Sequence, residues 1–164
     1  MKYMFASDVH GSAFYCRKML EAYREEGAER LVLLGDLLYH GPRNGLPRDY
    51  APKRVIPLLN ALADRIIAVR GNCDAEVDQM VLDFPVMADY ATLFDETGRE
   101  LFLTHGHEDH IGGIPYAMEQ FRCPIHATRL TTGIVQLKLE EHQLQNAVHL
   151  FTHEAGEKVK AGCF

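Results

Sequence analysis

The chain has 164 residues, 47% of them hydrophobic, which is enough for one globular domain with a sizeable core. Its formal net charge of −6 argues against nucleic acid as a partner, because binding to a duplex requires a broad cationic surface. The sequence lacks an apolar run of about 18 residues and a signal-peptide pattern, so we expect a cytoplasmic protein without a membrane partner. The four cysteines form no C-x-x-C pair, which predicts reduced thiols at Cys16, Cys73, Cys123 and Cys163.

The first half of the chain predicts strands that alternate with helices. We expect a buried strand over residues 2–7, followed by a helix that has Ser12 as its N-cap and runs to about residue 26. The next predicted elements are a buried strand at 30–34, a Gly- and Pro-rich loop at 37–50, a helix at about 52–63 and a strand at 66–69. This order predicts an α/β fold, in which parallel strands carry helices on the faces of a sheet.

The second half predicts a hairpin and then a return to alternating helices and strands. The hairpin comprises strands at 90–94 and 100–104 with a turn at 96–98. The other predicted elements are a short helix at 75–82, a helix at 114–121, a strand at 124–127, a helix at about 130–142, a strand at 148–152, and a further strand that begins at 161–164. We divide the chain into segments 1–103 and 104–164, and expect the two segments to pack as one α/β domain.

Polar residues follow each of the first three predicted strands at the point where the strand ends. Asp8 and His10 follow the first strand, Asp36 the second and Asn72 the third. Because sites in parallel sheets form beyond the carboxyl ends of the strands, we expect these side chains to converge. Carboxylate, imidazole and amide groups are suitable ligands for Mn²⁺ or Mg²⁺, and the two oxygens of Asp36 could bridge two ions. Each residue alone would also suit a turn, but together they predict a dinuclear metal centre.

Residues 1 to about 107 resemble the small bacterial calcineurin-like metallophosphoesterases, and in particular their phosphodiesterases. The resemblance rests on MFASDVHGS at 4–12, LGDLLYHGPRN at 34–44, AVRGNCDAEVDQM at 68–80 and LFLTHGH at 101–107. It implies a layered fold of sheets and helices and the hydrolysis of small phosphate esters with two divalent ions, Mn²⁺ being expected and Zn²⁺ the alternative. The metal ligands that it implies are Asp8, His10, Asp36, Asn72 and His105.

The same resemblance places His40, Arg43 and Asn44 on a loop over the metal site, where Arg43 could contact phosphate oxygens. A solvated Gly- and Pro-rich connection is the alternative for this loop. Cys73 stands where many relatives carry a catalytic histidine. The proton donor to the leaving group is therefore open, and Cys73 is kept as a catalytic candidate.

The end of the chain departs from the phosphoesterase pattern, because no G-H-x-H pair follows His107. Residues 104 to 164 instead resemble the ribonuclease J branch of the metallo-β-lactamase superfamily, on THGHEDHIGGIPYAM at 104–118 and PIHATRLTTGIVQLKLEEH at 124–142. This resemblance implies His105, His107, Asp109 and His110 as zinc ligands, of which the last three are secondary candidates because the later ligands of that fold are missing. His126 could replace one missing phosphoesterase ligand, or could be a surface or core histidine.

The two resemblances meet within LTHGH at 103–107, which suggests a chimera of natural, engineered or artefactual origin. We favour a metal-dependent phosphodiesterase, because the upstream ligands are the more complete set. The alternatives are a zinc nuclease that uses the downstream motif, and a chimera that binds metal but catalyses little because its ligand set is incomplete. Missing strands of a second sheet would expose apolar surface and sheet edges, so self-association into a homo-oligomer is a further expectation.

Overall fold

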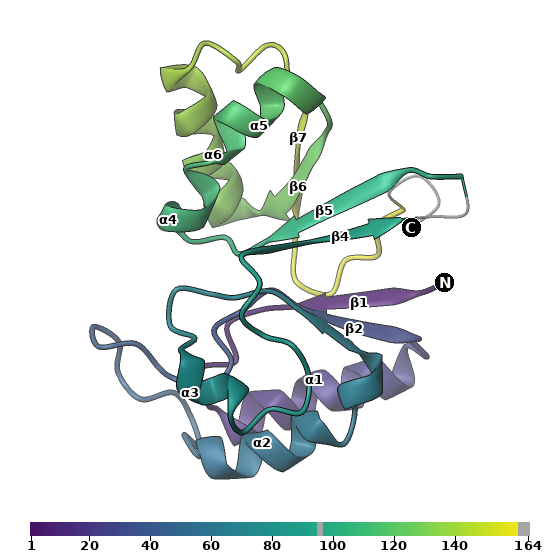
Figure 1. Cartoon of the computed structure of the whole chain (residues 1–164), viewed down its shortest axis with the longest axis vertical. Coiled ribbons are helices and arrows are strands. Elements are labelled where there is room, and N and C mark those ends of the chain that lie inside the picture. The colour runs from purple at the N-terminus through teal and green to yellow at the C-terminus, as the bar shows by residue number, and fades with distance from the viewer. Residues whose placement is uncertain (95–96, 161–164) are drawn as a thin grey trace. The chain divides into compact units, whose positions relative to one another are not determined.

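The computed structural model describes residues 1–94 and 97–160 of the chain (Figure 1). These residues form two compact units, Met1–His105 and a second unit that begins at Gly106. The division lies close to the predicted boundary between residues 103 and 104, while the expectation that the two segments pack as one domain stays a prediction. In the described part of the chain, no helix is both long and apolar enough to cross a membrane.

A three-stranded parallel sheet forms the centre of the first unit. Its strands are β1 (Tyr3–Ala6), β2 (Arg30–Leu33) and β3 (Ile66–Ala68), in the order β1-β2-β3. Met4 of β1 pairs with Leu31 of β2, and Val32 of β2 pairs with Ile67 of β3. The parallel pairing confirms the predicted α/β class. It also brings the ends of the three strands, and the loops that follow them, to the same edge of the sheet.

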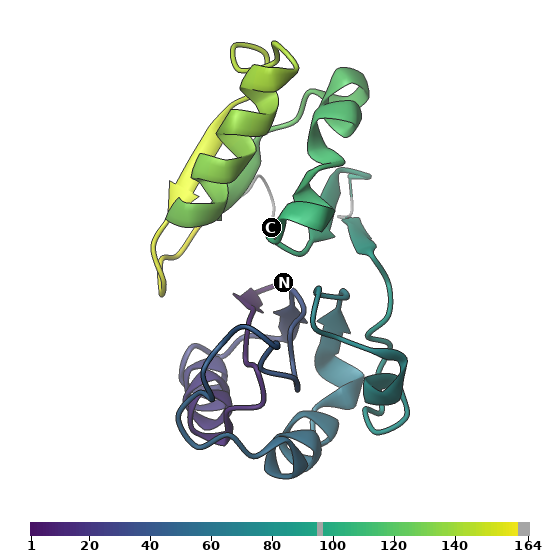
Figure 2. The same ribbon diagram turned by 90° about the vertical axis from the view of Figure 1, so that its left-hand side faces the viewer.

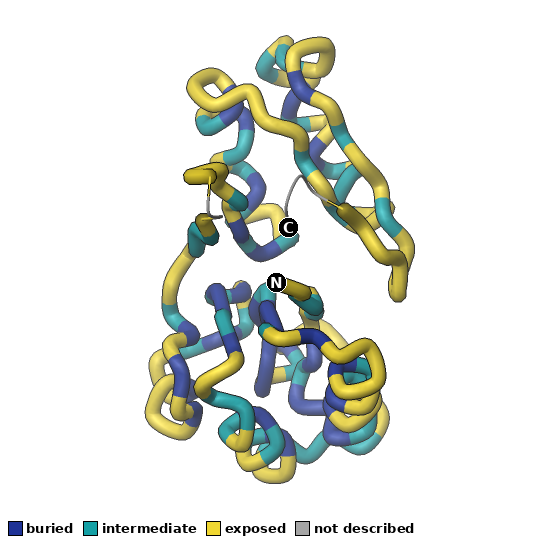
Figure 3. Tube along the Cα trace, turned by 90° about the vertical axis from the view of Figure 1, so that its right-hand side faces the viewer, coloured by how far each residue is buried: buried dark blue, intermediate teal, exposed yellow. Residues whose placement is uncertain are grey.

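Two helices, α1 (Ala13–Glu25) and α2 (Pro52–Asn60), cover one face of this sheet (Figure 2). Leu31 and Leu33 of β2 are buried in one core with Leu20 of α1 and Leu59 of α2. Because side chains alternate along a strand, Val32 points to the opposite face of the sheet. Buried side chains of the first unit therefore lie on both faces of β2. Figure 3 colours the trace by burial and shows buried stretches along the chain of this unit.

The predicted antiparallel hairpin is confirmed as β4 (Tyr90–Phe94) and β5 (Glu100–Thr104). It packs on that opposite face of the sheet. Leu103 of β5 is buried there with Val32 and Val69. On the outer face of the hairpin, the rings of Tyr90 and Phe102 stack with their centroids 5.0 Å apart. The turn predicted at 96–98 lies partly outside the described residues. Strand β5 leads directly to His105, which is how this histidine reaches the first unit.

Helix α1 begins and ends where its sequence predicts. The Ser12 hydroxyl accepts a hydrogen bond from the Tyr15 amide at 3.2 Å and donates one to the Arg48 carbonyl at 2.6 Å. The first bond caps the helix and the second fastens its start to the loop at 37–50. Gly27, at a φ of 60°, follows the helix in a left-handed conformation that a glycine adopts without steric cost.

Three features of the first half differ from the prediction. Strand β1 was expected to be buried, but it is an edge strand of the three-stranded sheet and Phe5 is 45% exposed. Helix α3 (Glu76–Gln79) is a single turn rather than a helix over 75–82, because the chain leaves it to bury Leu82 in the core. Helix α2 ends at Asn60 rather than at about residue 63, and the short 3-10 helix η1 (Ala63–Arg65) follows it.

The second unit contains two parallel strands, β6 (Ile125–Thr128) and β7 (Leu150–His153), connected by α6 (Arg129–Glu141). Helix α5 (Ile114–Phe121) matches its prediction, whereas α4 (Glu108–Ile111) is an additional turn that places Asp109 and His110 within a helix. The core of this unit consists of Ile111, Met118, Val135, Leu139 and Val148. Both Cys163 and the strand predicted to begin at 161–164 lie outside the described residues.

The Ser12 cap gives a first test of the fold. We expect Ser12→Ala to lower the free energy of unfolding by about 1–2 kcal/mol, because the variant loses the helix cap and the bond to Arg48. Urea unfolding followed by circular dichroism measures the change. Ser7→Ala is the control, because the Ser7 hydroxyl is exposed and makes one long hydrogen bond of 3.3 Å. Equal losses in the two variants would contradict the proposed role of Ser12.

Candidate metal centre

The three loops that follow β1, β2 and β3 are held together by main-chain hydrogen bonds. The amide of Asp8 donates to the Gly35 carbonyl at 3.1 Å, and the amide of His10 donates to the Asp36 carbonyl at 2.8 Å. The loop after β3 approaches even more closely, because a Cβ atom on Gly35 would lie 2.3 Å from the Gly71 nitrogen. Both glycines are therefore required by the contact between the second and third loops.

Three of the predicted ligands have left-handed backbone conformations. The φ angles of Asp8, His10 and Asp36 are 59°, 47° and 58°, in a region where residues with a side chain are rare. Such conformations cost about 1–3 kcal/mol each and persist where surrounding contacts enforce them, often at functional sites. Here they turn the three side chains towards one another.

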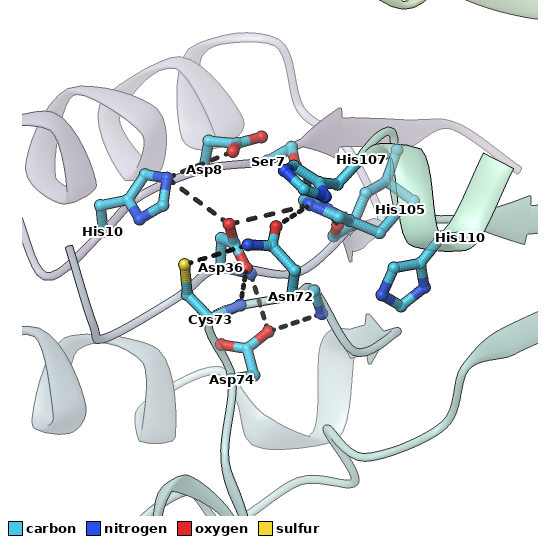
Figure 4. Close-up of polar contacts among 12 residues, drawn as sticks. Ser7, Asp8, His10, Asp36, Asn72, Cys73, Asp74, His105, His107 and His110 are labelled. Atoms are coloured by element: carbon cyan, nitrogen blue, oxygen red, sulfur yellow. Dashed lines mark hydrogen bonds and ion pairs between the residues drawn. The ribbon is translucent and has the colours of Figure 1, made fainter. Parts of the chain in front are cut away.

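The Asp36 carboxylate lies between two imidazole rings (Figure 4). Its Oδ2 atom is 3.6 Å from Nε2 of His10 and 3.7 Å from Nε2 of His105. Asp8 is 3.3 Å from the same His10 nitrogen, and the Asn72 side-chain oxygen is 3.1 Å from the same His105 nitrogen. The structure thus brings together all five ligands predicted for the dinuclear centre.

Among the described residues, two groups of potential metal ligands share Asp36. One group contains His10, Asp36 and Cys73, and the other contains Asp8, Asp36 and His105; within each group, one ligand atom per residue lies within 4.8 Å of the others. Asp36 and His105 are buried, whereas the Asp8 side chain is 54% exposed. The donor set is therefore open to solvent on the Asp8 side, where an ion or a substrate could enter.

Both histidine rings are oriented by main-chain carbonyls. Nδ1 of His10 lies 2.7 Å from the Tyr39 oxygen, and Nδ1 of His105 contacts the Leu34 oxygen. A carbonyl can only accept, so Nδ1 of each ring carries a proton, and Nε2, which faces the carboxylates, is the nitrogen that bears the lone pair when the ring is neutral. This tautomer is the one that a metal ion requires when it binds at Nε2.

Cys73 is close to the centre but differs chemically from the other members. Its amide donates to Asp36 Oδ1 at 2.7 Å, and its sulfur accepts a hydrogen bond from the Asn72 side chain at 3.4 Å. Burial raises the pKa of the Cys73 thiol to about 11, and the negative charge of Asp36 adds to this effect. The thiol is therefore protonated near neutral pH as long as no cation offsets those charges.

Asp74 is a buried residue that the sequence analysis did not identify. Its two carboxylate oxygens accept hydrogen bonds from the amides of Asp36 at 2.7 Å, Leu37 at 2.8 Å and Gly71 at 2.8 Å. Burial raises the pKa of Asp74, while these three bonds lower it. Asp74 thus joins the second and third loops without facing the ligand cluster. Its sequence context, an aspartate in a turn, carries no signal of these nonlocal partners.

The loop at 37–50 contains the predicted catalytic residues His40, Arg43 and Asn44. The Asn44 side chain donates to the His40 carbonyl at 3.1 Å, which stabilises the turn around Gly41. A Cβ atom on Gly41 would lie 3.3 Å from the Cys73 sulfur, so this turn approaches the metal centre. Arg43 is exposed, and His40 Nδ1 is buried without a hydrogen-bond partner among the described residues. The catalytic roles of the three residues stay predictions.

The secondary candidates His107, Asp109 and His110 belong to the second unit. Nδ1 of His107 is 2.7 Å from Asp109 Oδ1, and Nε2 of His110 is 3.8 Å from Asp109 Oδ2. Desolvation is the largest single influence on the pKa of Asp109 and raises it. The contact with His107 is among the interactions that lower it, and together they hold the pKa below its usual value. Within the described part of the chain, none of the three residues joins a three-membered group of potential metal ligands. Their predicted role in zinc binding stays untested.

Comparison with known proteins identifies the phosphoesterase resemblance across most of the chain. Residues 1–163 match the model of the calcineurin-like phosphoesterase superfamily domain. Phosphodiesterase YfcE of Escherichia coli strain K12 is 56% identical over 107 residues, or 65% of this chain and 58% of the relative. The solved structure of YfcE, described as a phosphoesterase, superposes with a TM-score of 0.66 at 36% identity, over 96% of this chain and 84% of that chain.

A second match is to a different class of protein, a ribonuclease, and covers a small part of it. Ribonuclease J 1 of Streptococcus pyogenes serotype M3 is 42% identical over 84 residues, which is 49% of this chain but 15% of the relative. The sequence matches thus span less than two thirds of YfcE and a small part of ribonuclease J 1. The family model extends over the residues that form the candidate centre, whereas the ribonuclease J 1 match concerns a fragment of a much larger protein.

The buried Asp74 carboxylate can be tested directly. We expect Asp74→Asn to lower the free energy of unfolding by about 3 kcal/mol, because an amide retains one accepting oxygen and turns an NH₂ group towards buried donors. Urea unfolding in the presence of a chelator measures the effect without bound metal. The control is Asp78→Asn, which perturbs one main-chain bond, from the Ala75 amide, at a cost of about 1 kcal/mol. Similar losses in the two variants would argue against Asp74 as the residue that joins the loops.

Proposed function

The chain belongs to the calcineurin-like phosphoesterase superfamily, and on that premise we propose that it is a phosphodiesterase that hydrolyses small phosphate esters at a dinuclear metal centre. Membership in this family implies divalent metal binding. The observation that carries the proposal is the sharing of the Asp36 carboxylate by two groups of potential ligands. A carboxylate with two oxygens is suited to hold two ions side by side.

We assign Asp8, His10, Asp36, Asn72 and His105 as the metal ligands. When bound, divalent ions would supply Lewis-acid polarisation of the phosphoryl group and acidify a water molecule. Mn²⁺ is the proposed ion, because Asp8, Asp36 and Asn72 offer oxygen atoms. Zn²⁺ is the alternative, since the Cys73 sulfur next to His10 and Asp36 would favour a softer ion.

The residues around the ligands would position and neutralise the substrate. Arg43, on the loop whose Gly41 turn approaches Cys73, would pair with phosphate oxygens through its guanidinium group. His40 and Asn44 hold that loop in shape, with the Asn44 side chain bonded to the His40 carbonyl. Cys73, as a protonated thiol beside Asp36, is a candidate donor to the leaving group.

We also propose that the segments on either side of LTHGH have different origins. The division between the two compact units falls within this string, after His105, and a fragment of ribonuclease J 1 is similar to part of the chain. The phosphoesterase family model nevertheless extends to residue 163. Whether or not the two segments share an origin, the sequence lacks the G-H-x-H pair after His107. An incomplete ligand set would lower the affinity of the centre for its second ion.

Asp36 is the most direct test of the proposed function. We expect Asp36→Ala to lose both bound ions and the Mn²⁺-stimulated hydrolysis of a nitrophenyl phosphodiester, because both groups of ligands include this carboxylate. Metal content by mass spectrometry and initial rates give the two readouts. Asp64→Ala serves as the control, since the Asp64 side chain is 82% exposed.

Full activity of Asp36→Ala would overturn the proposal. Cleavage of RNA that survives Asp36→Ala but is lost in Asp109→Ala would instead support the zinc nuclease. A wild-type protein that is monodisperse, binds one ion or none and shows no hydrolysis would support the catalytically impaired chimera.

Arg43 tests the substrate-binding part of the proposal. We expect Arg43→Ala to raise KM for the diester roughly 10-fold or more while the metal content stays unchanged, because a charged hydrogen bond to phosphate is lost. Steady-state kinetics at saturating Mn²⁺ separate KM from kcat. The control is Arg65→Ala, whose side chain is 57% exposed on the short helix η1. An unchanged KM in Arg43→Ala would exclude the phosphate contact and favour the solvated-loop alternative.

A further inference from the structure

Two histidines of the second unit face each other across the parallel strands β6 and β7. His126 of β6 pairs in register with Phe151, and His153 lies two residues further along β7, so the side chains of all three share one face of the sheet. Nδ1 of His126 is 2.8 Å from Nε2 of His153. The two rings are nearly parallel, with an interplanar angle of 3° and centroids 5.1 Å apart. Two imidazole nitrogens thus point at the same small region of space.

A glutamate lies beside the other nitrogen of His153. Oε1 of Glu157 is 3.1 Å from Nδ1 of His153, at ion-pair distance but without hydrogen-bond geometry, and Oε2 of Glu157 accepts a hydrogen bond from the Glu154 amide at 2.9 Å. The carboxylate favours a proton on Nδ1 of His153, which leaves the Nε2 lone pair directed at His126. A carboxylate behind an imidazole in this way is the usual support of a metal-binding histidine.

We propose that His126 and His153 form a metal site, separate from the candidate phosphoesterase centre, for a divalent transition ion that prefers imidazole, such as Zn²⁺, Ni²⁺ or Cu²⁺. Nδ1 of His126 and Nε2 of His153 are the protein ligands, and water completes the coordination sphere. Glu157 is a positioning residue, because it contacts the ring of His153 and not the ion.

In the metal-free pair, Nδ1 of His126 donates a hydrogen bond to Nε2 of His153, so an ion can bind only when His126 carries its proton on Nε2 instead and the two rings move slightly apart. Two nitrogens at about 2.0–2.1 Å from a tetrahedral ion are roughly 3.3 Å apart, so the 2.8 Å separation must open by about half an ångström. A modest rotation of the exposed His126 ring provides this. The ring of Phe151 stacks on His126 with centroids 4.8 Å apart and limits larger rotations. The His153 side chain is 19% exposed, so the pair is accessible to a solvated ion.

Other potential ligands of the second unit include His149 and Cys123. His149 lies ahead of β7 and is exposed, and its carbonyl is occupied by the Ile125 amide. The thiol of Cys123 contacts the sulfur of Met118 at 3.8 Å. The exposed histidine His149 therefore provides a matched control for the loss of one imidazole from the same unit.

Nitrogen-15 spectra of the histidine rings in the full chain test the proposal without any substitution. Addition of Zn²⁺ to metal-free protein is expected to shift Nδ1 of His126 and Nε2 of His153, while Nδ1 of His153 keeps its proton. Assignment uses the His126→Ala and His153→Ala spectra. Zinc saturation that leaves both ring nitrogens unshifted overturns the proposal, whether or not the protein hydrolyses phosphate esters.

Isothermal titration with Zn²⁺ provides the quantitative test. Because the first unit also offers ligands, the comparison is between variants: His126→Ala and His153→Ala should each bind one ion fewer than wild type. Glu157→Gln should weaken this site by roughly 10-fold, since second-layer partners of metal ligands contribute about that much. His149→Ala should match wild type. Wild-type stoichiometry in both His126→Ala and His153→Ala, in protein with unchanged circular dichroism, overturns the site.

Discussion

The Asp74 carboxylate accepts hydrogen bonds from three main-chain amides, and the arrangement of the candidate centre depends on these bonds. They join the loop after β2 to the loop after β3 at the point where Gly35 and Gly71 are in contact. A buried amide without an acceptor is costly, so the loops cannot separate without a large loss of stability. This constraint keeps Asp36 in a left-handed conformation and directs its carboxylate between His10 and His105.

The electrostatic character of the centre follows from the same constraint. Asp8, Asp36 and Asp74 lie close together at one edge of the sheet, and in the described part of the chain no Lys or Arg side chain forms an ion pair with them. Carboxylates that are close together and partly buried repel one another. Cations can relieve this repulsion, and the carbonyl contacts at Nδ1 leave Nε2 of each imidazole ring facing the Asp36 carboxylate as a possible ligand. The donor set therefore fits divalent ions better than it fits a purely structural role.

Each of the two compact units contains its own set of potential metal ligands. The first unit contains all five proposed ligands of the phosphoesterase centre, and the second contains the pair of His126 and His153. Each set is built from residues of one unit, so the properties of one can be altered by substitution while the ligands of the other are kept. The His107-x-Asp109-His110 part of the downstream motif lies at α4, where His107 and Asp109 pair with each other.

The sequence by itself determined the alternation of strands and helices, the caps of α1 and the polar residues at three strand ends, because these depend on local periodicity and on short motifs. It did not reveal the role of Asp74, whose partners at Asp36 and Leu37 are 38 and 37 residues away. Nor did it predict that β1 is an edge strand or that His126 faces His153, since both follow from strand order and register. Those features are decided by contacts between distant segments, which only the tertiary structure brings together.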